Sequence, residues 1–452
     1  TAALQKDCPC LTKLLIPRTF ISRNTPPDSY QFRIVMTGFS IAGVRAQFPA
    51  LSITDNGKSR IYLDNPAGTQ VPQHVIDRAN RAMVEQNANL GGAFVTSEMA
   101  LALVDKAHEA AAQFYNAPAT TDVFYGANMT TITLAMSRNL QKTLNLGEGD
   151  EIVLSRMDHD ANVAPWLLVA ADTGATVKWI EFDTDTFEFP DDALDKVLSD
   201  KTRIVAVSYA SNCTGTINDV KSMCAKARSA GAISYVDAVQ FAPHGVIDVQ
   251  DIGCDFLVSS AYKFFGPHQG IMYGRGDLLE SMFSYQVRPP LEYGSPAKFE
   301  TGSAPRETLA ASLGAIEYIA SLGDDDAGLP LSRSRIASGM QAAMGHEMAL
   351  TRQLIGGLTS IKGVKVRGIT SDNALARRVP TVSITMDGKN PADLAKSLAD
   401  DNTFLWSGHN YALEPINHMG LMADGGVLRI GLAHYNTAEE VDTLLEQLEG
   451  LG

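Results

Sequence analysis

The sequence predicts an α/β protein with a mostly parallel, doubly wound sheet in a large domain, followed by a smaller α+β domain. From residue 54 onward, short apolar segments alternate with amphipathic segments of helical period. Such alternation favours a parallel sheet with helices on both faces. The chain has 452 residues, a length that suits one large and one smaller domain better than a single core.

Short apolar runs bounded by turn residues predict the strands of the large domain. These runs are 61–63, 123–125, 151–154, 176–181, 203–209, 233–237, 256–260 and 270–273. Helical patterns lie between them at 97–115, 129–144, 161–173 and 220–230. Ligands bind at the carboxyl ends of the strands in such a sheet, so polar side chains that follow a strand are the first candidates for a site.

A long helical pattern opens the smaller domain, which we assign to residues 331–452. Its expected elements are a helix at 336–356, strands at 364–367, 381–386 and 427–432, and an amphipathic helix at 437–448. The N-terminal segment and large domain then occupy residues 40–330. The acidic patch 324–326 is expected to be a solvent-exposed turn at the junction.

Residues 1–39 form an N-terminal extension, disordered or similar to a transit peptide. Five basic side chains face two acidic ones there, among scattered Ser and Thr, a composition seen in organelle import signals. The alternative is an exposed extension or a misassigned translation start. We expect a cytoplasmic protein, with mitochondrial import left open.

Charge and composition exclude several classes of protein. The net charge of −14 without a basic stripe argues against nucleic-acid binding. No apolar run reaches the roughly 18 residues of a membrane span. The five cysteines form no CxxC pair, which argues for a reducing compartment and against a structural zinc, so we expect no metal site.

The most informative stretch is 258–271, where an apolar strand delivers Lys263 to a Gly-Pro turn. The apolar segment 232–240, upstream, carries Asp237 at the end of its strand. A lysine that forms a Schiff base and an acid that holds a pyridinium nitrogen are the two groups that a pyridoxal phosphate (PLP) enzyme needs. The alternative is a strand-end lysine beside an unrelated acid.

Polar side chains follow other strands as well. The cluster 128–130 opens a helix whose amide groups and dipole could hold a phosphate, or it is only an N-cap. His159 could lie on a cofactor ring and move protons, or it caps a helix. Asn212 could bond a phenolate oxygen, or it only forms a turn. Arg429, isolated in an apolar strand, suggests a carboxylate partner, or it is exposed on an edge strand.

Together these motifs resemble fold-type I PLP-dependent enzymes of the class V aminotransferase group, in the cysteine desulfurase-like branch. The similarity runs from about residue 40 to the C-terminus. It is carried by an ordered series of runs: 62–70, 89–94, 126–130, 159–162, 211–215, 237–240, 260–263, 299–303 and 429–436. An ordered series is far more specific than any single motif.

The resemblance implies a role for each position around the cofactor. Lys263 would form the Schiff base and carry protons, His159 would stack on the ring, and Asp237 would keep the pyridine nitrogen protonated. Contacts to the ring oxygen would come from Asn212 and Gln240. The phosphate would be held by Asn128, Met129, Thr130, Ser260 and Tyr262.

The resemblance also implies a substrate site and a partner. Arg429 would bind the substrate carboxylate, with the backbone at Ala67 and Gly68 closing over it and Tyr411 shaping the pocket. Ser303 would reach the phosphate of the neighbouring subunit, which implies a homodimer with active sites at the subunit interface.

Two positions depart from the family pattern. Sulfur-mobilising desulfurases carry a Gly-His-His-Cys-Ala-type loop whose cysteine holds the persulfide. The corresponding run here is Gly-His-Asn-Tyr-Ala at 408–412, and no cysteine follows Cys254. Tyr411 thus replaces the thiol, and a phenol cannot carry a persulfide. Tyr262 stands where many relatives have histidine, but its hydroxyl can still bond phosphate.

We therefore expect a PLP-dependent enzyme that acts on an amino acid through an external aldimine and a quinonoid, and not a persulfide-forming desulfurase. Transamination, epimerisation, elimination and carbon–carbon bond formation all remain open. Relatives without the cysteine include epimerases of peptide antibiotics and fungal cyclising enzymes, so a role in specialised metabolism is an option. The alternatives are a desulfurase that uses Cys213 and a PLP-binding protein without catalysis.

Overall fold

The computed structural model describes residues 39–287, 296–323 and 329–452. All described residues belong to one compact unit. The predicted extension, apart from its residue 39, and the acidic patch 324–326 lie outside the described residues. Within the described ranges, no helix combines the length and the apolar character needed to cross a membrane.

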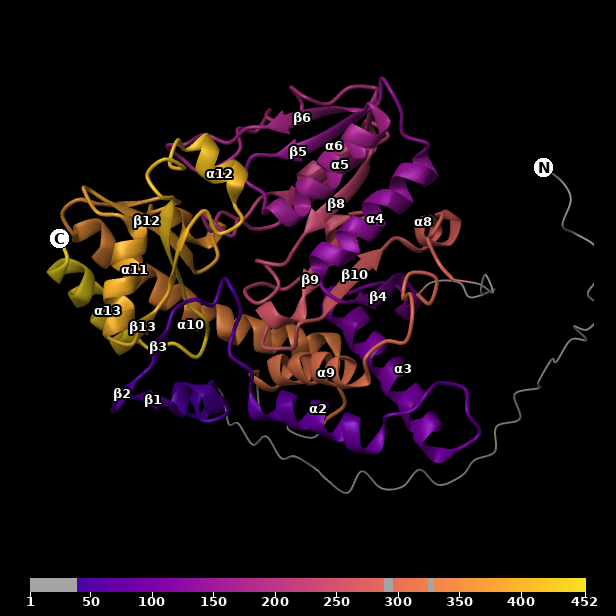
Figure 1. Ribbon diagram of the computed structural model, residues 1–452, viewed down its shortest axis with the longest axis horizontal. Coiled ribbons are helices and arrows are strands. Elements are labelled where there is room, and N and C mark those ends of the chain that lie inside the picture. Colours follow the sequence, from indigo (N-terminus) through magenta and orange to yellow (C-terminus); the bar gives the residue numbers. More distant parts are fainter. Residues whose placement is uncertain (1–38, 288–295, 324–328) are drawn as a thin grey trace, which may run out of the picture. The chain divides into compact units, whose positions relative to one another are not determined.

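Seven strands form the main sheet, in the order β4–β10–β9–β8–β7–β5–β6 (Figure 1). Their bounds are β4 Val123–Gly126, β5 Glu151–Ser155, β6 Thr176–Ile180, β7 Thr202–Ser208, β8 Ile233–Asp237, β9 Phe256–Ser260 and β10 Gly270–Gly274. The neighbouring strands β9, β8, β7, β5 and β6 pair in parallel. β10 is antiparallel to both β9 and β4. The predicted, mostly parallel sheet is confirmed.

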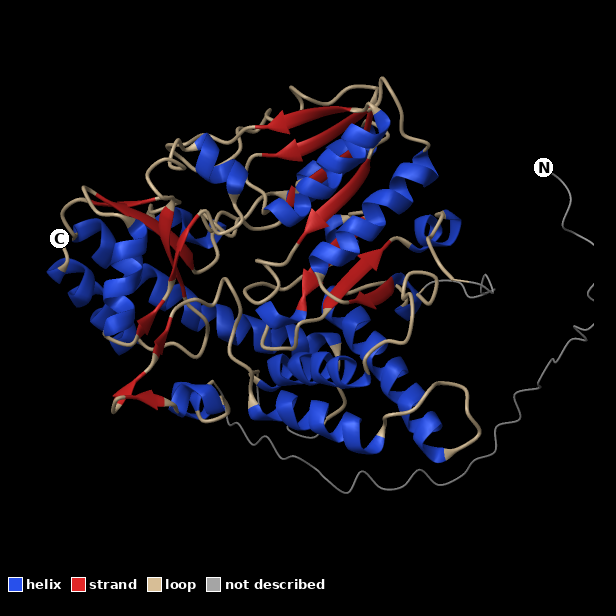
Figure 2. Ribbon diagram, viewed as in Figure 1, coloured by secondary structure: helices blue, strands red, loops and turns tan. Residues whose placement is uncertain are grey.

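Alternate residues of each strand enter two separate cores, one on each face of this sheet. Figure 2 shows helices packed along the sheet. On β5, for example, Val153 packs into one core, whereas Ile152 and Leu154 pack into the other. The first core is completed by α3 Val95–Tyr115, α6 Val220–Ser229 and α9 Arg306–Ser321, and the second by α4 Met129–Leu144 and α5 Ala164–Thr173. Burial on both faces explains why these strands are nearly continuous apolar runs.

A second, antiparallel sheet has the strand order β11–β12–β15–β14. Its strands are β11 Val364–Val366, β12 Thr381–Met386, β14 Trp406–Gly408 and β15 Val427–Gly431, and its helices are α10 Arg333–Ser360, α11 Pro391–Asp400 and α13 Ala438–Gly450. These elements share a third core. The predicted elements are present, and the domain boundary near residue 330 stays a prediction.

The remaining elements connect these two sheets or lie beside them. They are α1 Ile41–Arg45, β1 Thr54–Asp55, β2 Lys58–Ser59, β3 Ile61–Tyr62, α2 Gln73–Glu85, α7 Val249–Ile252, α8 Gly276–Ser281, β13 Thr403–Phe404 and α12 Leu413–His418. The predicted strand at 61–63 is present but does not join the main sheet, because β3 pairs in parallel with β13.

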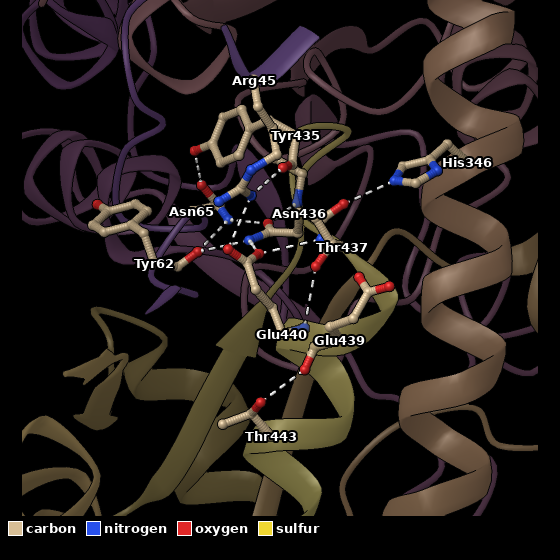
Figure 3. Close-up of polar contacts among 11 residues, drawn as sticks. Arg45, Tyr62, Asn65, His346, Tyr435, Asn436, Thr437, Glu439, Glu440 and Thr443 are labelled. Atoms are coloured by element: carbon tan, nitrogen blue, oxygen red, sulfur yellow. Dashed lines mark hydrogen bonds and ion pairs between the residues drawn. The ribbon is translucent and has the colours of Figure 1, made fainter. Parts of the chain in front are cut away.

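A network of polar side chains joins the segment after β3 to the segment before α13 (Figure 3). The amide Nδ2 of Asn65 donates to Oδ1 of Asn436 at 3.1 Å. Asn436 in turn donates to the carbonyl of Tyr62 at 3.0 Å and to Glu440 at 2.8 Å. Glu440 forms an ion pair with Arg45 at 2.9 Å. These bonds fasten one end of the 64–70 loop, which passes over the site described next.

Candidate active site

A cavity of about 440 Å³ lies at the carboxyl ends of β7, β8 and β9, within the range of small-molecule sites. It brings together eleven of the residues predicted from sequence: Ala67, Asn128, Met129, Thr130, His159, Asn212, Asp237, Gln240, Ser260, Tyr262 and Lys263. The sheet explains this convergence, because parallel strands present their carboxyl ends at one edge.

Lys263 ends a short 3₁₀ turn, Ala261–Lys263, directly after β9. Its side chain is almost fully buried, and Nζ donates a hydrogen bond to the carbonyl of Pro66. Burial, with the positive charge of Arg429 added, lowers the pKa of Lys263 to about 7. A large fraction of the amine is therefore neutral near neutral pH, as a nucleophilic lysine requires.

Asp237 is the last residue of β8 and is also buried. Its Oδ1 accepts a hydrogen bond from the amide of Val239 at 2.8 Å. Burial raises the pKa of Asp237 to about 6, against the opposing effects of that bond and of Lys263. A positively charged pyridinium beside it would favour the ionised carboxylate.

His159 follows β5, and its Nδ1 accepts a hydrogen bond from the amide of Ala161 at 3.0 Å. Burial lowers the pKa of His159 to about 3, and the charges of Lys263 and Arg429 act in the same direction. The ring is therefore neutral at physiological pH, which suits stacking on an aromatic ligand.

Asp158, which the sequence analysis missed, anchors the turn that carries His159. Its carboxyl group is buried and accepts hydrogen bonds from Ser155 and, at 2.6 Å, from Asn162. Burial raises the pKa of Asp158 to about 7. Nothing in the local sequence separates this acid from an exposed one, since its setting depends on the strands around it.

Two buried amide side chains each have an oxygen without a hydrogen-bond partner among the described residues. Asn212 donates from Nδ2 to the carbonyl of Asn410 at 2.9 Å, and Gln240 donates from Nε2 to Thr381 at 2.9 Å. Oδ1 of Asn212 and Oε1 of Gln240 are buried without a partner there. Because buried polar atoms are normally satisfied, these side chains fit a cavity that receives a polar ligand.

The N-terminus of α4 forms another wall of the cavity. Asn128 caps this helix, and the hydroxyl of Ser260 accepts from the amide of Met129 at 3.0 Å. Burial raises the pKa of Tyr262 to about 12, so its phenol stays protonated and can donate. Hydroxyl groups gathered at a helix N-terminus suit a phosphate. His268 also lines the cavity, stacked on Tyr262 with ring centroids 4.9 Å apart, and was not anticipated.

These groups fit PLP. Its phosphate corresponds in chemistry to the α4 terminus and its ring nitrogen to Asp237. Its ring oxygen accepts hydrogen bonds and corresponds to the amide NH₂ groups of Asn212 and Gln240, which each have two N–H donors and donate one of them to the bonds named above. Lys263 supplies the amine.

Arg429 lies on β15 between β12 and β14, so the alternative of an exposed arginine on an edge strand is wrong. Its side chain is only 4% exposed. One Nη donates to the carbonyl of Asn212 at 3.3 Å, and the other pairs with Asp64 at 3.4 Å. Its Nε has no partner among the described residues. Asp64 was not predicted, although it belongs to the run 62–70.

Besides Arg429, three more predicted residues lie outside the lining of this cavity. A Cβ on Gly68 would come within 3.2 Å of the Tyr262 ring, which places the 64–70 loop directly on that ring. Ser303 is exposed and lines a separate hollow. Tyr411 is 65% exposed, and its ring centroid is 5.7 Å from that of His159. The roles of these residues stay predictions.

Comparison with known proteins agrees with this geometry. The model of the aminotransferase class-V family matches residues 61–444. The chain belongs to this family. The aminotransferase-like protein FGM3 of Gibberella zeae is 34% identical over 420 residues, which cover 91% of this chain and 98% of that protein. A probable cysteine desulfurase of Synechocystis is 32% identical over 427 residues, 90% of this chain and 94% of the relative.

Solved structures extend the comparison to the fold. The cysteine desulfurase of Thermococcus onnurineus, solved in its apo form, superposes with a TM-score of 0.81 at 25% identity and covers 92% of this chain and 99% of its own. The fold class, the enzyme class and the PLP cofactor predicted from the sequence are thereby confirmed.

Proposed function

We propose that this family member acts on an amino acid whose carboxylate binds Arg429, and that it does not carry sulfur as a persulfide. The observation that carries the proposal is the cavity itself, where Lys263, Asp237 and His159 meet and which lies beside a buried arginine. PLP, when bound, supplies an electron sink for negative charge at the substrate α carbon.

The residues of the chain have separate tasks in this proposal. Lys263, with its pKa lowered to about 7, accepts a proton from the α carbon and returns one near neutral pH. Asp237 holds the proton on the ring nitrogen, and neutral His159 covers the ring. Arg429 orients the substrate through its carboxylate. Proton transfer at the α carbon leaves four reaction types: transamination, epimerisation, elimination and carbon–carbon bond formation.

The thiols of the described residues support the exclusion of persulfide chemistry. Cys213 is fully buried in an apolar cluster with Ala412, Ile416, Leu421 and Val427. Burial raises the pKa of Cys213 to about 11, so the thiolate that would attack sulfur is scarce at neutral pH. Tyr411, whose exposed ring lies near His159, stands at the loop position where sulfur-mobilising desulfurases have their cysteine.

A homodimer completes the proposal. Apolar side chains are exposed around the end of α2 and the start of α3, with Val84 at 83%, Val95 at 61% and Phe94 at 53%. Gathered apolar exposure of this kind marks an interaction surface. The hollow lined by Ser303 also includes Asn89, from the loop between these two helices. In a dimer formed through this surface, Ser303 reaches the partner's phosphate site. We therefore expect Ser303→Ala to weaken PLP retention. Light scattering of the wild-type protein should give the mass of a dimer.

The proposal is tested by adding single amino acids to the PLP-loaded protein, following the cofactor absorbance, and identifying products by mass spectrometry. We expect a spectral change and a product with at least one amino acid. No change with any amino acid contradicts the enzyme assignment. Catalytic sulfide release from L-cysteine that is lost in Cys213→Ser contradicts the exclusion of persulfide chemistry.

A further inference from the structure

The arginine that we assign to the substrate carboxylate already has a carboxylate beside it. Asp64 Oδ1 lies 3.4 Å from Nη2 of Arg429, and the two side chains are 15% and 4% exposed. Burial raises the pKa of Asp64, while the charges of Arg429 and Lys263 oppose the rise. The negative charge of Asp64 therefore lies next to Arg429, the cation that we assign to the substrate carboxylate.

The backbone that carries Asp64 is fixed on both sides, which keeps its carboxylate within reach of Arg429. Asp64 forms a β-bridge with Gly431, two residues after Arg429 on the same segment. The next residue, Asn65, is held by Asn436 in the network of Figure 3. Further along the 64–70 loop, Thr69 donates to the carbonyl of Tyr262 at 3.1 Å. A substrate carboxylate that reaches Arg429 must therefore share it with Asp64.

The contact also leaves room for a second anion. Both bonds of the guanidinium are long, at 3.3 Å and 3.4 Å, and Nε has no partner among the described residues. A guanidinium presents five donors and binds carboxylates best through two parallel bonds. Arg429 thus has free donor capacity but little surplus positive charge.

We propose that Asp64 is a specificity-determining residue, whose charge balances Arg429 and sets the site to accept one singly charged carboxylate with limited affinity. This inference rests on the proposed function, because it needs Arg429 to meet the substrate. Repulsion between Asp64 and the incoming anion weakens binding, and a doubly charged group is disfavoured further.

The test compares glycine with methylamine, which has the same amine but no carboxylate, in absorbance titrations of the PLP-loaded protein. In Asp64→Asn we expect the affinity for glycine, taken as a ratio to that for methylamine, to rise about three- to tenfold, since a nearby like charge has been removed. The ratio cancels the effect of the Asp64 charge on Lys263, which both amines share. Asp401→Asn, which removes a charge from the exposed ion pair with Lys58, leaves both affinities unchanged.

The outcomes separate this inference from the proposed function. Equal binding of glycine and methylamine by the wild-type protein overturns the Arg429 assignment itself. A wild-type preference for glycine that stays the same or weakens in Asp64→Asn, with the melting temperature retained, overturns only the role of Asp64. Changes of equal size for both amines leave the ratio of the two affinities unchanged and also overturn it.

A second measurement needs no variant. Aminomethylphosphonate carries two negative charges at alkaline pH, and the wild-type protein should bind it more weakly than glycine. Tighter binding of the phosphonate overturns the proposed charge balance. If Asp64→Asn loses PLP, Asp64→Ser removes the same charge with a smaller side chain and is measured against the same pair of amines.

Discussion

The two sides of the active site are built in different ways. Asp237 ends strand β8 and Lys263 follows strand β9, and these parallel strands are neighbours in the middle of a sheet whose faces are both buried. Arg429 and Asp64 are 365 residues apart in the chain and meet where the 64–70 loop touches β15. We refer to these as the cofactor side and the substrate side.

The comparison teaches that chemistry and selectivity have separate structural supports in this molecule. Changes on the cofactor side act on groups held by one rigid sheet. Changes on the substrate side act on the charges of Arg429 and Asp64, which balance each other only because the 64–70 loop contacts β15. Variants on the two sides should therefore differ in what they alter: the rate of turnover on one, and the binding of the substrate carboxylate on the other.

The largest effect is expected for Lys263→Ala, which removes the amine that carries the proton. Turnover should fall below detection, while PLP stays bound without a covalent link because the α4 terminus is intact. Product formation and cofactor absorbance after gel filtration check these outcomes, with the exposed Lys221→Ala as control. Borohydride reduction that attaches PLP to another lysine contradicts the assignment of Lys263.

Truncation of the substrate-side cation should have the next largest effect. Arg429→Ala leaves Asp64 without its counterion and the substrate without its partner, a loss of about 2–5 kcal/mol for a buried charge pair. KM should rise by about 30-fold or more, with less change in kcat and with PLP retained. Arg352→Ala, in an exposed ion pair, is the control. A variant that lowers kcat alone would place Arg429 on the cofactor side.

The buried lysine also predicts a pH dependence of stability in the PLP-free protein. Its pKa is about 7 when folded and about 10.4 when unfolded, so the unfolded chain binds more protons between these values. Stability then rises with pH over this window, by on the order of a few kcal/mol. Urea unfolding at pH 7, 8 and 9 should show the rise in wild type relative to Lys263→Met. An equal slope in both proteins contradicts it.

The smallest effect is expected for Tyr411→Phe. The Tyr411 phenol is 65% exposed, so we expect it to orient the substrate and not to act as an acid or a base. We expect a loss of kcat/KM within about tenfold, as for one neutral hydrogen bond to the substrate, with PLP binding unchanged. Tyr285→Phe, another exposed tyrosine, is the control. A loss of several hundredfold with a shifted pH profile would assign acid–base work to Tyr411.

The cofactor side could be predicted from the sequence, and the substrate side only in part. Each strand of the main sheet carries its own apolar signal, and a polar residue at or just after the carboxyl end of the strand marks the site, as at Asp237 and Lys263. Arg429 was visible because it interrupts an apolar strand. Its partner Asp64 was not, because the pairing depends on a tertiary contact between segments 365 residues apart. The burial of Asp158 was not visible either, because it depends on the strands packed around it.

The bond between Asn65 and Asn436 has a consequence for how the protein is made. The ribosome synthesises the chain from its N-terminus, and contacts between residues far apart in the sequence form late. All strands of the main sheet have been synthesised by residue 274, so the cofactor side can fold while translation continues. The 64–70 loop must wait for Asn436, which is synthesised after α10 and all strands of the second sheet. The nascent protein thus completes the strands around Lys263 and Asp237 long before it can bring Asp64 and Arg429 together.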